Sequence, residues 1–135
     1  MGGKLLQLEV RSRSRNEMVD ITALVGDKIR AAGIQDGVCH LFVLHTTAGL
    51  TVNEGADPTV QSDMLGFLSR VIPADPRFAH AEGNSDAHIK ASLVGPSLTL
   101  LISGGQPVLG TWQAIYLCEF DGPRQRRVAI KVVAG

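Results

Sequence analysis

Residues 38–46 read VCHLFVLHT and are apolar on both alternating sets of positions. A strand with one wet face alternates apolar and polar residues, so this run is typical of a strand in the centre of a sheet or covered on both faces. The pattern therefore predicts a central β-strand over residues 38–46, with His45 at its exit.

Upstream of this strand, the sequence predicts one helix and one strand. In residues 20–33 apolar residues recur at helical spacing, Asp20 can cap the start, and Gly33 suits the left-handed position after the end. The apolar positions of this helix are Ile21, Leu24, Val25, Ile29 and Ala32. Residues 4–11 alternate between apolar and polar side chains, which indicates a strand with one wet face. Arg13 and Arg15 continue its polar set, as a solvated strand end would.

Downstream, a turn and a short extended piece over residues 47–54 precede a second helix, for which Asp57 is the N-cap and Pro58 the first residue. Pro73 marks its limit. Its expected buried stripe consists of Val60, Met64, Phe67, Leu68 and Val71. A short third helix is expected from Ser85 or Asp86 to Gly95.

The last third of the chain is rich in predicted strands. They cover residues 97–103, 108–109, 113–120 and 127–133, with a Gly104-Gly105 turn after the first. Their short links favour antiparallel neighbours. Strands that flank two or three helices without βαβ alternation predict an α+β domain over residues 1–135, built on an antiparallel sheet or sandwich.

Composition restricts the class of protein. Thirteen basic and thirteen acidic side chains give no net charge, which argues against a nucleic-acid-binding protein that relies on phosphate neutralisation. There is no signal-peptide pattern and no apolar span of about twenty residues, so we expect no membrane association and a cytoplasmic location. Cys39 and Cys118 lie in apolar runs and are expected to be buried thiols.

Residues 78–90, FAHAEGNSDAHIK, carry most of the chemistry and little that suits a core. His80 and His88 lie eight positions apart, with Glu82 and Asp86 between them, and a loop could bring them to His45. Three imidazoles that leave an open position are typical of a catalytic zinc site. The alternative is that His80 and His88 are ordinary loop residues at the surface.

Other polar residues are open to two interpretations. Asn53 and Glu54 follow His45 and either form a turn or orient imidazoles and act as a general base. Trp112 is either a core or interface residue or part of a ligand pocket. The arginine-rich turn over residues 119–127 either binds phosphate oxygens or is solvated. His40 is expected to be packed or hydrogen-bonded.

Three ordered blocks, HTTAGLTVNEGADP (45–58), HAEGNSDAHIKAS (80–92) and GTWQAIYLCEFDGPRQR (110–126), resemble the YjbQ-like (UPF0047) family. Members of this family carry the label secondary thiamine-phosphate synthase. The resemblance implies an α+β fold on an antiparallel β-sandwich, a homotrimer and a metal-binding cluster. The implied activity joins a pyrimidine diphosphate to a thiazole phosphate with loss of pyrophosphate.

Carried over to this sequence, the resemblance implies His45, His80 and His88 as ligands of a divalent metal, most of all zinc, with magnesium accompanying the substrate diphosphate. The candidate catalytic residues are Asn53, Glu54 and Asp86. The candidate substrate-binding residues are Thr46, Thr47, Thr111, Trp112, Gln113, Arg124 and Arg126. The same groups also suit a metal-dependent phosphate-ester hydrolase, or a non-catalytic module that binds a phosphorylated metabolite.

Overall fold

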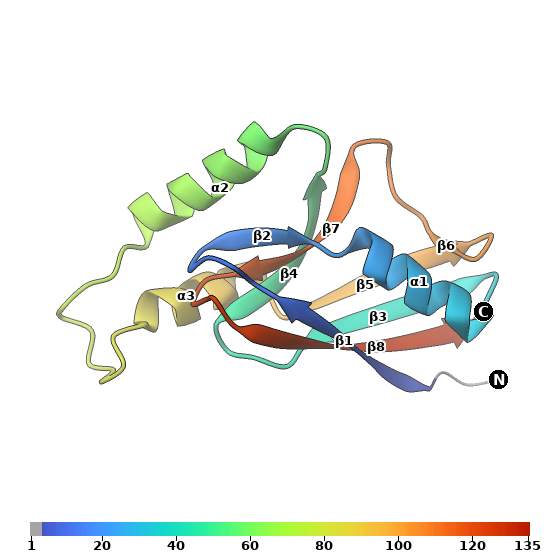
Figure 1. Cartoon of the computed structure of the whole chain (residues 1–135), viewed down its shortest axis with the longest axis horizontal. Helices are drawn as coiled ribbons and strands as arrows, with labels where there is room; N and C mark the ends of the chain where they lie inside the picture. The colour runs from blue at the N-terminus through green and yellow to red at the C-terminus, as the bar shows by residue number, and fades with distance from the viewer. Residues whose placement is uncertain (1–3) are drawn as a thin grey trace.

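In the computed structural model, which describes residues 4–135, β3 (Gly37–Val43) lies in the centre of a five-stranded antiparallel sheet. The strand predicted over residues 38–46 therefore ends three residues earlier than expected, and residues 44–46 belong to the link that follows. The order of the strands in this sheet is β1 (Leu5–Arg11), β8 (Gln125–Ala134), β3, β5 (Ser97–Ser103) and β6 (Gln106–Pro107). A three-stranded antiparallel sheet consists of β2 (Glu17–Asp20), β7 (Gln113–Glu119) and β4 (Ala48–Glu54), in that order. The helices are α1 (Thr22–Ala32), α2 (Pro58–Val71) and α3 (Ser85–Val94) (Figure 1). The expected α+β fold with antiparallel sheets is confirmed.

The main core lies between the two sheets and α1. Alternate residues of the larger sheet, such as Leu41 and Ile130, face Ile115 and Leu117 of β7, and Val25 and Ile29 of α1 complete the cluster. The opposite residues of β3 face outward, and Phe42 is half exposed. The expected central position of β3 is therefore confirmed, whereas only one of its faces is covered.

The strand that is covered on both faces is β7. Its Ile115 and Leu117 belong to the main core, while Ala114, Tyr116 and Cys118 form a second cluster with Ala87 and Ala91 of α3 and with partly buried residues of α2. Each parity of β7 thus has its own apolar environment, which explains an almost continuous apolar run. Cys39 and Cys118 are buried free thiols, as expected, and burial raises their pKa to about 11 and about 12.

Several predicted helix ends are confirmed by their capping contacts. The Asp57 side chain accepts a hydrogen bond from the Thr59 N–H, Pro58 opens α2, and Gly33 ends α1 with a φ of 70°. The start of α1 was predicted too early, because Asp20 ends strand β2. Its carboxylate still accepts from the Thr22 N–H at 2.9 Å.

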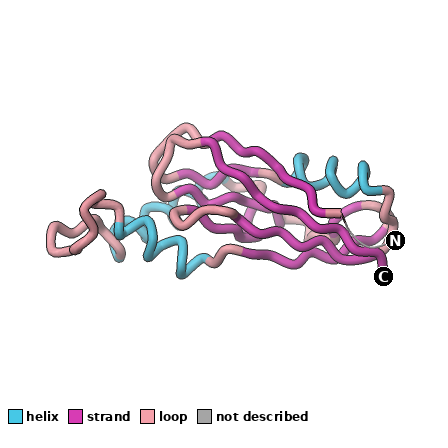
Figure 2. The backbone as a smooth tube through the Cα atoms, turned by 90° about the horizontal axis from the view of Figure 1, so that it is seen from below, coloured by secondary structure: helices cyan, strands magenta, loops and turns pink. Residues whose placement is uncertain are grey.

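The stripe predicted for α2 is wrong in part. Phe67 and Val71 are each 57% exposed, and no residue from Asp57 to Gly83 is buried. Figures 1 and 2 show the reason: α2 and the loop that follows it extend away from the sheets, at the end of the molecule opposite α1 and both termini. None of the helices within residues 4–135 is long and apolar enough to cross a membrane.

The short link between β7 and β8 was expected to join antiparallel neighbours, but the two strands do not pair. It carries the chain from the smaller sheet to the larger one, and β8 pairs with β1 and β3 instead. The link requires glycine at position 122, because a Cβ there would lie 2.3 Å from the Ser14 carbonyl oxygen.

Both ends of this link are tied by a buried ion pair between Glu119 and Arg126. The carboxylate also accepts from the Ser12 hydroxyl at 2.6 Å and the Asp121 N–H at 2.9 Å, and Arg126 donates to the Thr47 hydroxyl at 2.9 Å. Burial alone would raise the pKa of Glu119, but the hydrogen bonds from Arg126, Ser12 and Asp121 hold it below its ordinary value. The network therefore joins the two sheets through charged groups that are almost entirely buried.

We predict that Glu119→Gln lowers the free energy of unfolding by about 3–5 kcal/mol at pH 7, because the substitution leaves the Arg126 charge buried without its partner. Urea denaturation measures this loss, with Glu9→Gln on the exposed side of β1 as control. Because the pKa of Glu119 is lowered in the folded state, its carboxylate stabilises the fold fully only above the unfolded pKa of about 4.3. The difference in unfolding free energy between wild type and variant should therefore shrink as the pH falls below about 4.3. A loss below about 1 kcal/mol at pH 7 would contradict a stabilising role for the pair.

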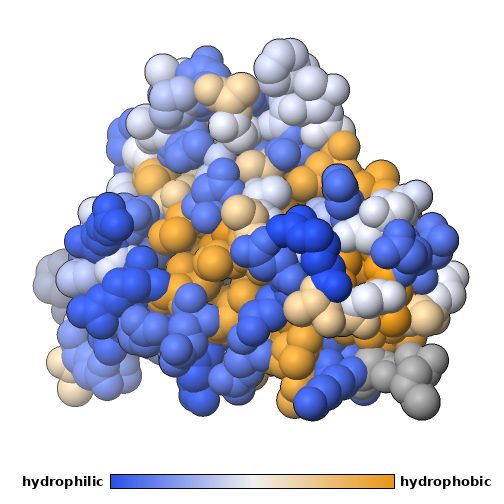
Figure 3. Space-filling view, turned by 45° about the vertical axis from the view of Figure 1, so that its right-hand side comes forward, coloured by the Kyte–Doolittle hydropathy of each residue, from blue (hydrophilic) through white to orange (hydrophobic). Residues whose placement is uncertain are grey.

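The outer face of the larger sheet leaves apolar side chains exposed, among them Phe42 and Leu101, and Leu101 is 61% exposed. Figure 3 shows apolar areas interrupting a hydrophilic surface on the face that it presents. The homotrimer implied by the resemblance stays a prediction, and it would cover such areas. Light scattering should give about three times the 14.4 kDa chain mass, and a concentration-independent monomer would exclude it.

Candidate functional site

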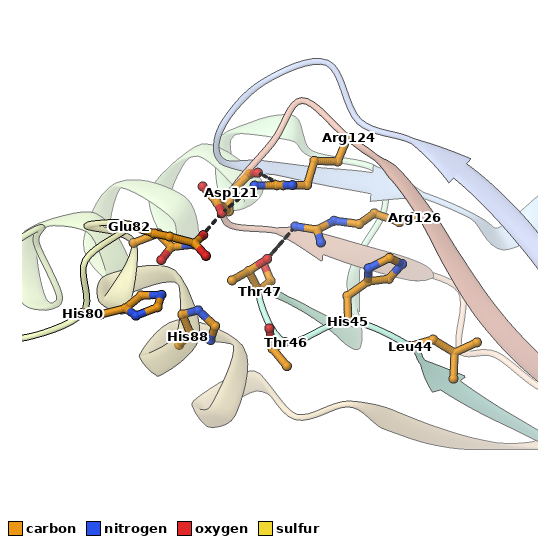
Figure 4. Close-up of a pocket in the computed structure, with 11 residues that line it drawn as sticks. Leu44, His45, Thr46, Thr47, His80, Glu82, His88, Asp121, Arg124 and Arg126 are labelled. Atoms are coloured by element: carbon orange, nitrogen blue, oxygen red, sulfur yellow. Dashed lines mark hydrogen bonds and ion pairs between the residues drawn. The ribbon is translucent and has the colours of Figure 1, made fainter.

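An open cavity of about 440 Å³ lies where the β3–β4 link, the β7–β8 link and the start of α3 meet (Figure 4). It brings together His45, His80 and His88, the three predicted metal ligands, with two of the three threonines and both arginines of the predicted substrate site. The lining residues are Leu44, His45, Thr46, Thr47, His80, Glu82, Asn84, His88, Asp121, Arg124 and Arg126.

The two histidines from residues 78–90 lie side by side. His80 belongs to the loop before α3 and His88 to the helix itself, and their rings meet edge to face with centroids 5.5 Å apart. His88 is half-buried and His80 exposed. Both imidazoles line the cavity, so they can meet a ligand there.

His45 lies across the cavity from this pair, in the link after β3 (Figure 4). Its Nε2 accepts a hydrogen bond from the Arg127 N–H at 2.9 Å, so in the neutral ring the proton is on Nδ1. Burial lowers the pKa of His45, and the positive charges of Arg126 and Arg127 lower it further. The His45 imidazole is therefore neutral near pH 7, with its proton on Nδ1.

The arginines are held by carboxylates from the same link. Arg124 donates through Nε to the Asp121 carbonyl at 2.8 Å and through Nη2 to its carboxylate at 3.1 Å. Arg126 uses Nε and Nη2 for Glu119 and Thr47. In both guanidiniums Nη1 makes no hydrogen bond within residues 4–135, so it is the atom left to meet a ligand.

Asp86, a predicted catalytic residue, is buried behind the cavity. Its two oxygens accept from the Arg15 guanidinium at 3.1 and 3.2 Å, and the buried Lys90 lies 3.4 Å away. Burial alone would raise its pKa, but the hydrogen bonds and charges of Arg15 and Lys90 hold it below its ordinary value. Asp86 therefore anchors α3, and Arg15 is an ion-pair partner where a solvated residue had been expected.

The remaining predicted residues lie at the other end of the smaller sheet. Asn53 and Glu54 end β4, about 20 Å from its start at about 3.3 Å per residue. The Glu54 carboxylate accepts from the Ala56 and Asp57 N–H groups, at 2.8 and 3.2 Å, and the Asn53 side chain accepts from the Glu54 N–H. In this chain both residues end a strand, and their side chains hold the backbone at the start of the turn that follows.

Three substrate-binding candidates share that end. Thr111, Trp112 and Gln113 line a separate cavity of about 310 Å³ with Asp20 and Thr22, among others. Trp112 is 65% exposed, so it is not a core residue. His40, which was expected to be packed or hydrogen-bonded, is exposed on the outer sheet face, and its Nδ1 is hydrogen-bonded to the Thr99 hydroxyl at 3.3 Å, as expected.

Sequence analysis gave no role to Glu119, Asp121 or Asn84. The available signal for Glu119 was an acidic residue inside the otherwise apolar run AIYLCEF, which indicates a buried partner of opposite charge. Asn84 donates to the Asp121 carboxylate at 2.8 Å, a contact between segments 37 residues apart for which the sequence holds no signal.

A sandwich of two antiparallel sheets, with a cavity of histidines and arginines at one end, defines the class of protein. The model of the family described as "UPF0047 protein YjbQ-like" matches residues 6–135, and the chain belongs to this family. It is 49% identical over 129 residues to a UPF0047 protein of Methanocaldococcus jannaschii, with 96% of this chain and 94% of the relative covered. The UPF0047 protein YugU of Bacillus subtilis is 45% identical over 130 residues, with 96% and 98% covered.

Solved structures agree with this assignment. A YjbQ/UPF0047 family protein of Clostridium acetobutylicum superposes with a TM-score of 0.92 at 45% identity, over 95% of this chain and 99% of the other. A protein of Sulfolobus solfataricus, described as YbjQ-like and of unknown function, gives a TM-score of 0.92 at 29% identity, with 98% of each chain covered.

The donor chemistry of the cavity suits zinc, but the donors do not converge. Within residues 4–135, no three His, Cys, Asp or Glu side chains gather closely enough to hold a metal ion. His45 has committed the lone pair of Nε2 to the Arg127 N–H, so its ring would have to turn before it could bind metal. The three-histidine metal site stays a prediction.

We predict one zinc ion per chain in the purified protein and its loss in His88→Ala, because two imidazoles alone bind the ion weakly. Elemental analysis of both proteins measures the content. His40→Ala removes an exposed imidazole from the outer sheet face and should retain the metal. Equal zinc content in wild type and His88→Ala would refute the assignment.

Proposed function

We propose that this cavity binds a phosphorylated small molecule and that the chain is an enzyme that acts on it. One observation carries the proposal: two arginines, three imidazoles and the side chains of Thr46 and Thr47 line a single cavity. Guanidinium and hydroxyl groups are strong donors to phosphate oxygens.

The fixed position of Arg126 favours anion binding. Glu119 and Thr47 hold its guanidinium before a ligand arrives, so little side-chain entropy is lost when Nη1 meets an oxygen. Arg124 is held in the same way by Asp121, although it is more exposed. The carboxylates of Glu119 and Asp121 offset part of the positive charge of the two arginines. The phosphate of the ligand would therefore meet directed hydrogen-bond donors in a site without a large excess of positive charge.

The specific reaction we propose is thiamine phosphate synthesis, as a main or a secondary activity. The bond between the pyrimidine-bearing carbon and its diphosphate breaks, a new bond to the thiazole phosphate forms, and pyrophosphate leaves with the electron pair. Arg124 and Arg126 would stabilise the charge that grows on the leaving group. His80 and His88 line the same cavity and are the groups that we propose as proton carriers.

A divalent metal ion is part of the proposal. Zinc would be held by His80, His88 and a turned His45, and magnesium could enter with a substrate diphosphate. A bound divalent ion would supply additional stabilisation of phosphate charge.

A non-catalytic module that binds a phosphorylated metabolite is the second candidate. It is favoured by the fact that the carboxylates of Glu54 and Asp86 are engaged in hydrogen bonds outside the cavity. In either case we propose a cytoplasmic location, since both cysteines are free thiols, as in a reducing compartment.

We predict that His80→Ala and Arg124→Gln each lower thiamine phosphate formation by more than about a hundredfold, roughly 3 kcal/mol in the barrier. His80→Ala removes a proton carrier, and Arg124→Gln removes a charge at the leaving group. The assay measures product from the two precursors, with binding of both precursors measured on the same samples. His40→Ala and Arg30→Gln, on the outer sheet face and α1, are the matched controls.

Glu54→Gln is measured in the same series, because Glu54 is a predicted catalytic residue that lies far from the cavity of its own chain. A loss as large as that of His80→Ala would assign Glu54 to the cavity of a neighbouring copy, since one chain holds the two about 20 Å apart. Retained binding without turnover in the wild type, across a panel of phosphorylated substrates, would refute the enzyme and leave the binding module.

A further inference from the structure

A second cavity, of about 320 Å³, adjoins the histidine cavity. Its lining residues are His45, Thr46, Ala48, His88, Ala91, Ser92 and Pro96. His45, Thr46 and His88 line both cavities, so the two are neighbouring parts of one groove. The histidines thus lie near its middle, with the arginines at one end.

The two ends of this groove differ in chemistry. The arginine end contains four ionised side chains, which are Glu82, Asp121, Arg124 and Arg126. Among the described residues that line the other end, no Asp, Glu, Lys or Arg is present. We call this part the alanine end, after Ala48 and Ala91.

The polar groups at the alanine end are largely committed. The Ser92 hydroxyl donates to the His88 carbonyl at 2.9 Å, inside helix α3. Ala48 and Ala91 offer methyl groups and Pro96 offers its ring. A charged group placed there would lose its water without gaining an ionised partner, whereas an apolar group would gain contacts.

We propose that the groove binds an elongated ligand, with a phosphate or diphosphate at the arginine end and an uncharged ring or short apolar chain at the alanine end. His45 and His88 then lie beside the bonds that join the two parts of the ligand. This inference rests on the proposed function and assigns the uncharged part of its phosphorylated substrate to the alanine end. Each cavity is at the small end of the roughly 300–1,000 Å³ typical of ligand sites, so a ligand that spans both is a better match in size.

The test compares methyl phosphate with phenyl phosphate, which differ in the group that would occupy the alanine end. Calorimetric titration of the wild type should give phenyl phosphate an affinity about tenfold higher, which corresponds to about 1.4 kcal/mol. Ser92→Phe should fill the alanine end and reduce this preference below about twofold. It should leave the affinity for methyl phosphate unchanged.

Ser62→Phe is the matched control. Ser62 is also exposed and donates its hydroxyl to the carbonyl four residues earlier, that of Pro58, but it lies on α2 and outside both cavities. Its variant should keep the wild-type preference for phenyl phosphate. A second measurement needs no variant: on titration with phenyl phosphate, the ring should shift the methyl resonances of Ala48 and Ala91 in the wild type.

Two results would overturn the inference while the proposed function stands. They are equal affinities for the two esters in the wild type, and an unchanged preference in Ser92→Phe. Failure of both esters and of inorganic phosphate to bind would refute the proposed function itself, and with it this inference.

Discussion

The buried ion pair between Glu119 and Arg126 is the constraint on which the arrangement of this protein depends. The two residues flank the link that carries the chain from one sheet to the other, and Ser12 and Thr47 bring the ends of two further strands to the same carboxylate and guanidinium. Two charges removed from water are tolerated only when hydrogen bonds satisfy them fully. The requirement fixes the spacing of the two sheets at one end, and the cavity opens there.

The same contacts explain how a packing element becomes part of a binding site. Arg126 donates to the core network through two nitrogens and also lines the cavity, so one side chain belongs both to the buried network and to the candidate site. Asp86 plays the corresponding part in α3: its pairing with Arg15 ties the helix that presents His88 to the segment after β1, while Lys90 pairs with it from within the same helix.

Much of the fold could be predicted from the sequence because its signals are local. The alternation in β1, the Asp57-Pro58 start of α2 and the position of Gly33 each depend on a few neighbouring residues. Strand pairing across 113–134 could not be predicted, since it depends on whether a link turns back or crosses between sheets. The exposure of Phe67 also escaped prediction, because helical periodicity indicates an apolar face and not what covers it.

The candidate site could be predicted by residue type and only in part by place. His45, His80 and His88 line one cavity because the β3–β4 link and α3 are neighbours in space. Asn53 and Glu54 follow His45 closely in sequence, yet an extended strand carries them away from it.

The absence of buried residues from Asp57 to Gly83 also bears on affinity. Segments with little buried apolar surface open at low free-energy cost, independently of the strands beneath them. His80 and Glu82 belong to this segment, whereas Arg126 and Thr47 belong to the buried network. One wall of the cavity therefore belongs to the core, and we expect the other to open at a lower free-energy cost. The apparent affinity of a ligand that needs this wall closed is the intrinsic affinity multiplied by the closed fraction of molecules, so substitutions in α2 that never touch the ligand can tune its binding.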